Sequence, residues 1–278
     1  MSSGVLPGQN PGEPVLRVRG LTVELNRERN AAVPIIRDVS FEVATGAIVG
    51  LFGESGCGKT TLALALLNLL PAPRYRVRGS VQLKNHDVLS APARQLERIR
   101  GAEISLVFQD PLLALNPVLR VRDQVAEVMR AHGRQGSLES LFGLVGLAAT
   151  PRMYDAYPHQ LSGGERQRVV IAQALACRPA LVIADEPFTA LDAPRVVELS
   201  SLFRELREKL GISFLLISHS PGVLVRTADQ VLVIEAGRIV ERGTPGQVFG
   251  HPSHPCTAAL LQAMAQVRRP IRGTAHGQ

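Results

Sequence analysis

The chain has no tryptophan, and aromatic residues make up only 4% of its 278 residues. This composition argues against a stacking platform for single-stranded nucleic acid, which needs exposed aromatic rings. Cysteine is scarce too: Cys57, Cys177 and Cys256 lie far apart and form no CxxC pair. An odd, scattered set of cysteines predicts neither a disulfide framework nor a zinc finger, and it fits a reducing compartment.

Long apolar runs are also absent. No segment has the roughly 18 consecutive apolar residues that a membrane-spanning helix needs, so none is predicted. The first residues, MSSGVLPGQNPGEP, are polar and rich in Gly and Pro, and they lack the apolar core of a signal peptide. Residues 1–14 are therefore expected to form a disordered N-terminal extension.

Positive charge is plentiful: the formal net charge is +7. Nucleic acid, acidic lipid headgroups and phosphorylated ligands are the anionic partners that such a charge suggests. The basic residues are scattered along the chain, however, which favours a solvated Arg-rich surface over an anionic partner. With 45% hydrophobic and 20% charged residues, the composition is that of a globular protein with a sizeable core.

Short apolar segments alternate with helical patterns, which is typical of a mostly parallel α/β sheet. Buried strands are predicted at 47–53, 104–109, 180–186 and 212–219, and helices at 60–70, 93–101 and 194–211. Alternating strands at 15–25 and 35–43 indicate an appended antiparallel unit, and a helical block is predicted at about 118–160.

The segment GESGCGKT, Gly53–Thr60, fits the phosphate-loop pattern GxxxxGK[ST] between a predicted strand and a predicted helix. Its glycines let backbone N–H groups surround a phosphate. Lys59 reaches the β- and γ-phosphates, and the Thr60 hydroxyl ligates Mg²⁺. The residues expected to contact the nucleotide here are Gly53, Ser55, Gly56, Cys57, Gly58, Lys59, Thr60 and Thr61.

Polar residues follow three of the predicted strands. The predicted strand within ALVIADEP ends in two adjacent acids, Asp185 and Glu186. Gln109 and His219 end two other apolar segments. The carboxyl ends of parallel strands meet at the ligand crevice of such sheets. Asp185 is therefore expected to hold Mg²⁺ through water, and Glu186 to polarise the attacking water in phosphoryl transfer.

The segment LSGGERQRVVIA, 161–172, predicts a helix start with a capping box between Ser162 and Glu165. The tandem glycines Gly163 and Gly164 leave the backbone open to close approach, as at a phosphate site on a helix N-terminus. One chain thus carries two candidate phosphate-binding elements.

Taken in order, these motifs resemble the nucleotide-binding subunit of ABC transporters over roughly residues 15–250. The resemblance implies an α/β ABC cassette of the P-loop NTPase class, with a RecA-like, mostly parallel sheet core and an antiparallel β subdomain. A helical subdomain is then inserted at about 111–168, and residues 251–278 form a C-terminal extension.

The resemblance also implies roles and partners. Gln109 would contact Mg²⁺ or water and a transmembrane partner, Asp192 would lie at a dimer interface, and His219 would sense the γ-phosphate. A second ATPase chain, identical or different, would pair head-to-tail, so that Ser162, Gly163 and Gly164 meet the partner's ATP. Two transmembrane permease subunits and, indirectly, a periplasmic or extracellular solute-binding protein would complete the assembly at the cytoplasmic face of the inner membrane. No nucleic acid is expected.

Three segments narrow the resemblance to the dipeptide, oligopeptide and nickel importer group: GESGCGKTTL, FQDPLLALNP (108–117) and HPSHPCTAALLQAM (251–264). The implied function is ATP hydrolysis that powers uptake of a small solute, such as a peptide, nickel or a metal chelate. Cys256 stands where the group usually has Tyr, and a single cysteine there does not support an iron–sulfur cluster. The family often stacks adenine on an aromatic residue upstream of the phosphate loop. Here the only aromatic residue between positions 15 and 51 is Phe41, which lies inside a predicted strand, so Ile35 or Ile36 is the expected contact for adenine.

Two alternatives stay open. The basic charge suggests a soluble ABC ATPase in a nucleic-acid or metabolic complex, although the second cassette or long coiled-coil insertion usual in such proteins is absent. The ATPase of an exporter with separate membrane subunits is the other.

Overall fold

The computed structural model describes residues 13–27, 30–189 and 191–267. Most of the predicted N-terminal extension, Ala190 and the end of the predicted C-terminal extension lie outside these residues. Among the described residues, no helix is both long and apolar enough to cross a membrane.

A six-stranded sheet forms the centre of the molecule, in the order β10-β9-β3-β8-β7-β6. Its first five strands in chain order are parallel, and β10 pairs with β9 in the antiparallel sense. The strands are β3 (Ile48–Phe52), β6 (Ile104–Val107), β7 (Leu181–Asp185), β8 (Ser213–Ile217), β9 (Gln230–Glu235) and β10 (Arg238–Gly243). Strand β3, which leads into the phosphate loop, lies between β8 and β9.

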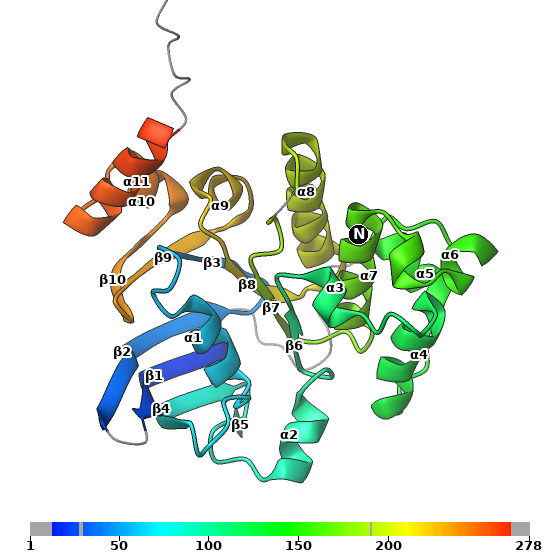
Figure 1. The fold of residues 1–278 in the computed structure, drawn as a ribbon, viewed down its shortest axis with the longest axis horizontal. Helices are drawn as coiled ribbons and strands as arrows, with labels where there is room; N and C mark the ends of the chain where they lie inside the picture. Colours follow the sequence, from blue (N-terminus) through cyan, green and yellow to red (C-terminus); the bar gives the residue numbers. More distant parts are fainter. Residues whose placement is uncertain (1–12, 28–29, 190, 268–278) are drawn as a thin grey trace, which may run out of the picture.

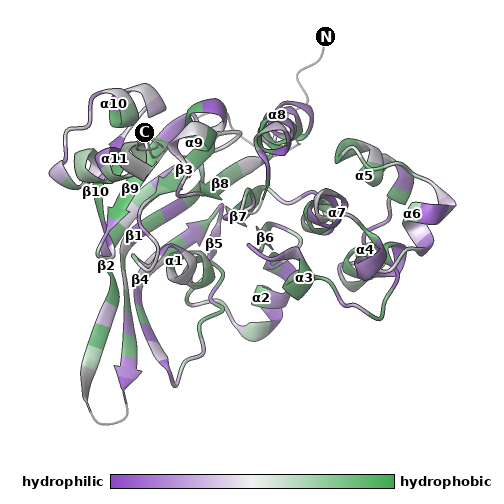
Figure 2. Ribbon diagram, turned by 45° about the horizontal axis from the view of Figure 1, so that its top comes forward, coloured by the Kyte–Doolittle hydropathy of each residue, from purple (hydrophilic) through white to green (hydrophobic). Residues whose placement is uncertain are grey.

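Every residue of β3, β7 and β8 is buried, because the sheet is covered on both faces. Alternate residues enter two different apolar clusters: Phe214 and Leu216 belong to one, Leu215 and Ile217 to the other. Figure 2 shows these central strands as predominantly hydrophobic. The continuous apolar segments in the sequence therefore reflect strands with no solvent-facing side.

The second sheet is antiparallel, in the order β2-β1-β4-β5. Its strands are β1 (Pro14–Arg27), β2 (Asn30–Ala44), β4 (Tyr75–Leu83) and β5 (His86–Asp87). In register, Val18 lies opposite Phe41 on one side and Val81 on the other, and all three are buried. These residues share a cluster with Leu62 and Leu66 of the first helix, so the antiparallel sheet packs on that side of the core.

Helices cover the parallel sheet and fill the segment between β6 and β7. They are α1 (Lys59–Leu66), α2 (Ala93–Ile99), α3 (Pro111–Ala114), α4 (Val121–Ala131), α5 (Leu138–Leu144), α6 (Pro151–Asp155), the 3₁₀ turn η1 (Pro158–Gln160), α7 (Gly163–Leu175), α8 (Ala193–Leu210), α9 (Pro221–Thr227), α10 (Pro245–Gly250) and α11 (Pro255–Val267). In Figure 1, α4 to α7 lie together on one side of the central strands, and the antiparallel sheet lies on the other.

The predicted fold class is confirmed, but three element ends differ from the prediction. Helix α1 ends at Leu66 instead of residue 70, and Asn68 adopts a left-handed backbone with φ 52°. Strand β6 ends at Val107, which pairs with Ala184, and its only neighbour, β7, ends one residue later at Asp185, so β6 has little left to pair with. Strand β8 ends at Ile217. Gln109 and His219 therefore lie two residues beyond their strands.

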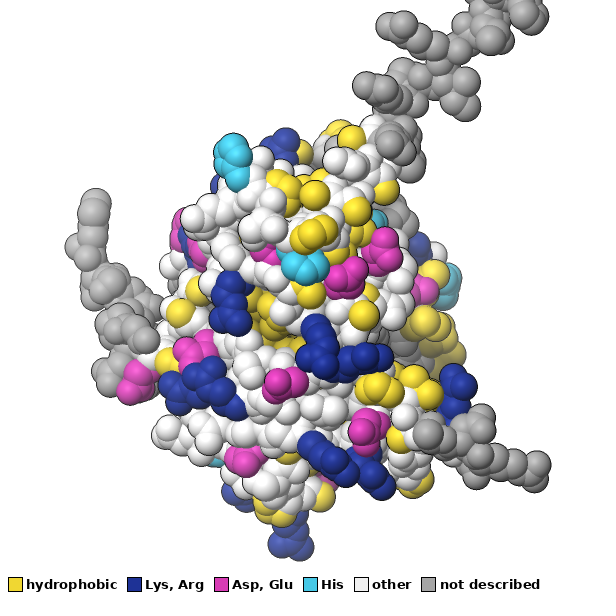
Figure 3. Space-filling model, turned by 90° about the vertical axis from the view of Figure 1, so that its left-hand side faces the viewer, with side chains coloured by type: hydrophobic (Ala, Val, Ile, Leu, Met, Phe, Trp, Pro, Cys, Tyr) yellow, Lys and Arg dark blue, Asp and Glu magenta, His cyan; other side chains and the backbone are white. Residues whose placement is uncertain are grey.

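The surface charge is mixed on the face that Figure 3 presents, where Lys and Arg side chains are interspersed with Asp and Glu. No continuous basic stripe crosses that face, as the scattered basic residues of the sequence predict.

Candidate nucleotide-binding site

The phosphate loop leaves β3 and enters α1 through backbone conformations that require glycine. Gly56 and Gly58 have φ of 83° and 106°, in the left-handed region where side chains with a Cβ are strained. Gly53 is needed for space, because a Cβ there would lie 2.4 Å from the carbonyl oxygen of Ile234 on β9. Such glycine conformations are typical of loops whose backbone N–H groups surround an anion.

Lys59 is the first residue of α1, and its side chain is only 7% exposed. The ammonium group donates hydrogen bonds to the carbonyl oxygens of Gly53 (2.9 Å) and Glu54 (2.8 Å). It also lies 3.9 Å from Oε1 of Glu186. The loop thus folds around its own lysine, which holds the charge at the centre of the site.

Glu186 follows β7 directly and takes a left-handed backbone conformation, with φ 49°. Its backbone N–H donates to the carbonyl oxygen of Ile217 at 3.0 Å, which ties it to the end of β8. Oε2 lies 2.8 Å from Nδ1 of His219, whose backbone N–H donates to the same oxygen at 3.4 Å. The side chain, 11% exposed, is held between the lysine and the histidine.

Asp185 ends β7 and is 5% exposed. Burial raises the pKa of this carboxyl group, while a hydrogen bond from the Thr60 side chain and the charge of Lys59 act to lower it. Its Oδ1 is buried without a hydrogen-bond partner. A buried carboxylate oxygen with no partner beside a threonine hydroxyl is a donor pair that suits a hard cation such as Mg²⁺.

The other predicted residues of this region are placed less tightly. Gln109 lies just beyond the end of β6, beside β7, and its side chain is exposed. Cys57 is half-buried in the loop, and burial raises the pKa of its thiol. Ile35 or Ile36 is the expected contact for adenine; Ile36 is fully buried, whereas Ile35 is partly exposed, so burial favours Ile35 of the two.

The second candidate phosphate-binding element lies at the start of helix α7, where the predicted capping box is confirmed. The Glu165 backbone N–H donates to Oγ of Ser162 at 3.2 Å, and the Ser162 N–H donates to Oε2 of Glu165 at 2.8 Å. Nothing lies within 4 Å of a Cβ built at Gly163 or Gly164. Ser162 and Gly164 line a cavity of about 360 Å³ that includes no residue of the phosphate loop. The two elements are therefore separate within the described chain.

Asp192, predicted at a dimer interface, is the N-cap of α8. Its Oδ1 accepts the backbone N–H of Arg195 at 3.0 Å, and its Oδ2 lies 3.8 Å from the Nε of the same residue. The side chain is 61% exposed, so it is accessible as well as structural.

Ile234 is a site residue that no sequence pattern indicates. Its carbonyl oxygen packs against Gly53. A Cβ atom at Gly53 would also lie 3.0 Å from the Ile234 side chain. The contact arises because β9 pairs with β3, two strands separated by about 180 residues. The contact of Ile234 with the phosphate loop can be recognised only once the strand order is known.

Comparison with known proteins agrees with this geometry. Residues 36–189, more than half of the chain, match the family described as ABC transporter. A probable peptide ABC transporter ATP-binding protein of Sinorhizobium fredii is 42% identical over 238 residues, which cover 83% of this chain and 71% of that protein. The dipeptide transport ATP-binding protein DppD of Bacillus subtilis is 39% identical over 92% of this chain and 78% of its own length.

Solved structures show the same fold. An ATP-binding cassette, determined as a dimer in a post-hydrolysis state with ADP and Pi, matches with a TM-score of 0.72 and 24% identity, over 83% of this chain and 98% of that one. CbiO1 from Clostridium perfringens matches with a TM-score of 0.72 and 23% identity, over 92% and 96%. The chain therefore belongs to the ABC transporter family, in which it is an ATP-binding subunit that hydrolyses ATP.

Proposed function

We propose that this ATPase powers the uptake of a small peptide through separate permease subunits in the membrane. The observation that carries the proposal is the line Lys59–Glu186–His219, which sets a buried carboxylate beside the phosphate loop. The peptide as solute is supported by the names of the relatives, which are described as peptide or dipeptide transport proteins. Nickel and metal chelates are the other solutes of the resembling group.

In the proposed mechanism, Lys59 stabilises the charge of the β- and γ-phosphates, and the loop N–H groups bind their oxygens. Glu186 accepts a hydrogen bond from the attacking water and orients it toward the γ-phosphorus. His219 contacts Oε2 of Glu186 and positions that carboxylate. In this mechanism the same histidine also senses the γ-phosphate. Because phosphoryl transfer depends mostly on positioning and charge, these fixed contacts carry the catalysis.

Asp185 and the Thr60 hydroxyl would hold Mg²⁺, with Gln109 as a further oxygen donor. When bound, Mg²⁺ neutralises charge on the phosphate oxygens. The partnerless Oδ1 of Asp185 supports this assignment. Ile35 is the proposed apolar contact for adenine, because it is partly exposed and lies next to Gly58.

The open start of α7 supports a head-to-tail pair of ATPase chains. In the described residues, no hydrogen bond or ion pair joins Ser162, Gly163 or Gly164 to the chain's own phosphate loop. A helix N-terminus with open glycines attracts an anion. We infer that this one binds the γ-phosphate of ATP held by the partner chain, with Asp192 at the same interface.

Replacing Ser162 tests this pairing. Ser162→Arg places a bulky side chain where the partner's phosphate approaches, so ATPase activity of the assembled transporter is expected to fall by on the order of 100-fold. ATP affinity of the isolated chain should stay within about 2-fold, as measured by fluorescence titration. Loss of the cap costs about 1 kcal/mol of stability.

A matched control is Ser137→Arg, which removes the N-cap of α5 in the same way but away from the site. It should lose comparable stability and keep its ATPase activity. If Ser162→Arg abolished ATP binding in the isolated chain, Ser162 would serve its own nucleotide and the pairing would be wrong.

Four exposed apolar side chains lie close to Gln109 in the sequence. Phe108, Leu112, Leu113 and Val118 are 47%, 56%, 87% and 74% exposed, which is unusual for large apolar side chains close together in sequence. We propose that this apolar segment around α3 binds the membrane subunits at the cytoplasmic face. Leu113, the most exposed of the four, is the natural position to test.

Leu113→Glu is expected to reduce recovery of the chain with its permease by about 10-fold, or ~1.4 kcal/mol of binding. Nucleotide affinity should be unchanged, since the Leu113 side chain on α3 is exposed to solvent. Val197→Glu on α8 is the control, because it charges another exposed apolar residue (43%) elsewhere. Equal recovery of the Leu113 variant and the wild type would place the docking surface elsewhere.

The proposal as a whole is tested by purifying the chain from native membranes, identifying the accompanying subunits and reconstituting them in liposomes. ATP-dependent entry of labelled dipeptide is the expected result. Solute movement out of the cytoplasmic compartment would identify an exporter instead. Salt-dependent nucleic-acid binding without any membrane partner would favour the soluble complex.

A further inference from the structure

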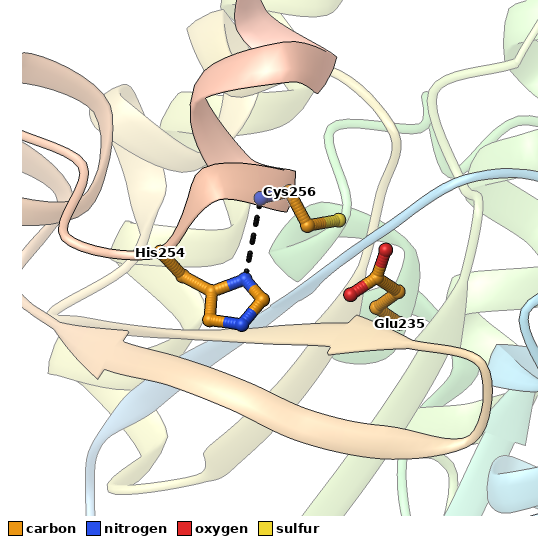
Figure 4. Close-up of side chains that lie close together, drawn as sticks. All are labelled: Glu235, His254 and Cys256. Atoms are coloured by element: carbon orange, nitrogen blue, oxygen red, sulfur yellow. Dashed lines mark hydrogen bonds between the residues drawn. The ribbon is translucent and has the colours of Figure 1, made fainter.

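The hairpin β9–β10 and the segment before α11 bring together three side chains that the ATPase chemistry does not use. Glu235 ends β9, His254 precedes α11, and Cys256 lies in its first turn. One ligand atom from each lies within 4.8 Å of the other two. Figure 4 shows the three side chains converging, with the Cys256 thiol directed toward the Glu235 carboxylate.

We propose that Glu235, His254 and Cys256 form a binding site for a single divalent cation of the Zn²⁺ type, with water completing its coordination. Thiolate, imidazole and carboxylate together suit Zn²⁺ and similar metals, whereas Mg²⁺ and Ca²⁺ prefer oxygen ligands alone. Neither the nucleotide site nor the proposed transport role requires this cation, so the site stands independently of both.

The distances are compatible with a tetrahedral site. Metal–ligand bonds of about 2.0–2.3 Å place the ligand atoms about 3.3–3.8 Å apart. Since the ligand atoms lie up to 4.8 Å apart, metal binding requires their separations to shorten by about 1 Å or somewhat more. The carboxylate of Glu235 can supply that movement, because its side chain is exposed at the hairpin tip.

The protein holds the two halves of the site in place. The buried carboxylate of Glu241 on β10 accepts the backbone N–H of Ser253 at 2.8 Å and that of His254 at 3.2 Å. The backbone N–H of Cys256 donates to Nδ1 of His254 at 3.3 Å, which orients the ring beside the first turn of α11. The hairpin is therefore fastened to the segment that carries His254 and Cys256 before any metal binds.

The site also adjoins the phosphate loop. Glu235 directly follows Ile234, whose carbonyl oxygen packs against Gly53. The negative charge of Glu54 in the loop acts on the Cys256 thiol. A cation that fixed the hairpin tip would therefore stiffen one wall of the nucleotide site.

Binding must displace a proton. A cysteine thiol has an ordinary pKa of about 8.5, so it is mostly protonated at neutral pH, whereas a metal binds the thiolate. As the sulfur–metal bond forms, the S–H bond breaks and the proton passes to the buffer. Calorimetry in two buffers of different ionisation enthalpy should register about one proton per cation.

The test uses the full chain without a polyhistidine tag, freed of metal by a chelator and titrated with Zn²⁺ or Co²⁺ in the absence of nucleotide. One equivalent is expected to bind, with a thiolate-to-Co²⁺ charge-transfer band in the near ultraviolet. Cys256→Ser should abolish that band, and His254→Gln should weaken Zn²⁺ binding by about 10-fold or more. Absence of the band in the wild type would overturn the proposal.

Matched controls exist within the chain. Cys177→Ser removes a buried thiol at the end of α7, and His251→Gln removes an exposed imidazole three residues before His254. Both should bind the cation as the wild type does. Glu235→Gln covers the case in which Cys256→Ser unfolds: this exposed change should weaken binding and keep the band. Wild-type affinity in both Glu235→Gln and His254→Gln would also refute the site.

Discussion

Glu186→Gln is expected to lower the rate of ATP hydrolysis by about 100-fold or more while ATP binding persists. The amide keeps the size of the side chain but cannot accept a proton or orient water as a carboxylate does, and a positioned base contributes about 10²–10⁴-fold. Oε1 and Oε2 face Lys59 and His219, so the replacement leaves the surrounding packing in place. Single-turnover hydrolysis and nucleotide affinity, measured on the same preparation, separate the two effects.

The variant should also accumulate an ATP-dependent dimer in size-exclusion chromatography, since hydrolysis is what releases the proposed pair. Glu208→Gln makes the same chemical change on the exposed face of α8 and should behave as the wild type does. Hydrolysis by Glu186→Gln at the wild-type rate would show that another group orients the water.

Lys59→Ala is expected to weaken ATP binding by at least 10-fold and to reduce hydrolysis on the order of 1000-fold. Among the described residues, Lys59 is the only lysine or arginine whose side-chain nitrogen lies within 4 Å of the Glu186 carboxylate. Its removal also leaves the carbonyl groups of Gly53 and Glu54 without their donor, at about 1.5–3 kcal/mol for a charge-assisted hydrogen bond. Isothermal titration and thermal unfolding without nucleotide measure the two losses separately.

Lys59→Met separates charge from packing, because it keeps the alkyl chain against the loop and removes only the ammonium. Both Lys59 variants should lose ATP affinity, and the methionine variant should unfold at the higher temperature of the two. Lys209→Ala on α8 is the neutral control, because among the described residues this ammonium forms an ion pair with the exposed Glu205 alone. ATP affinity at the wild-type level in Lys59→Met would remove the lysine from phosphate binding.

Much of the fold could be predicted because its central strands are apolar throughout. A strand buried on both faces leaves a continuous apolar segment, and β3, β7 and β8 all follow that rule. The start of α7 could be predicted at the level of single atoms, since the capping box of Ser162 and Glu165 is a local pattern. Local chemistry of this kind needs no knowledge of the tertiary structure.

The rest depended on pairing between distant segments. The early end of β6 follows from the length of β7, and the burial of Ile36 follows from packing against the phosphate loop and the antiparallel sheet. The closeness of Glu235 to His254 and Cys256 follows from the bonds of Glu241 to the segment before α11. The only local signal of that cluster was the spacing His254-x-Cys256, which is too short a pattern to be specific alone.

At position 186 the left-handed backbone favours glycine, whereas the chemistry of the site needs a carboxylate. For a residue with a Cβ this conformation costs about 1–2 kcal/mol, and glycine would adopt it more readily. Glycine, however, has no carboxylate to set between Lys59 and His219. The position therefore illustrates a trade between stability and activity, in which a stabilising replacement would remove the chemistry. Searches for more heat-resistant variants of this enzyme should exclude residue 186 and seek their gains in helix caps and loops far from the nucleotide.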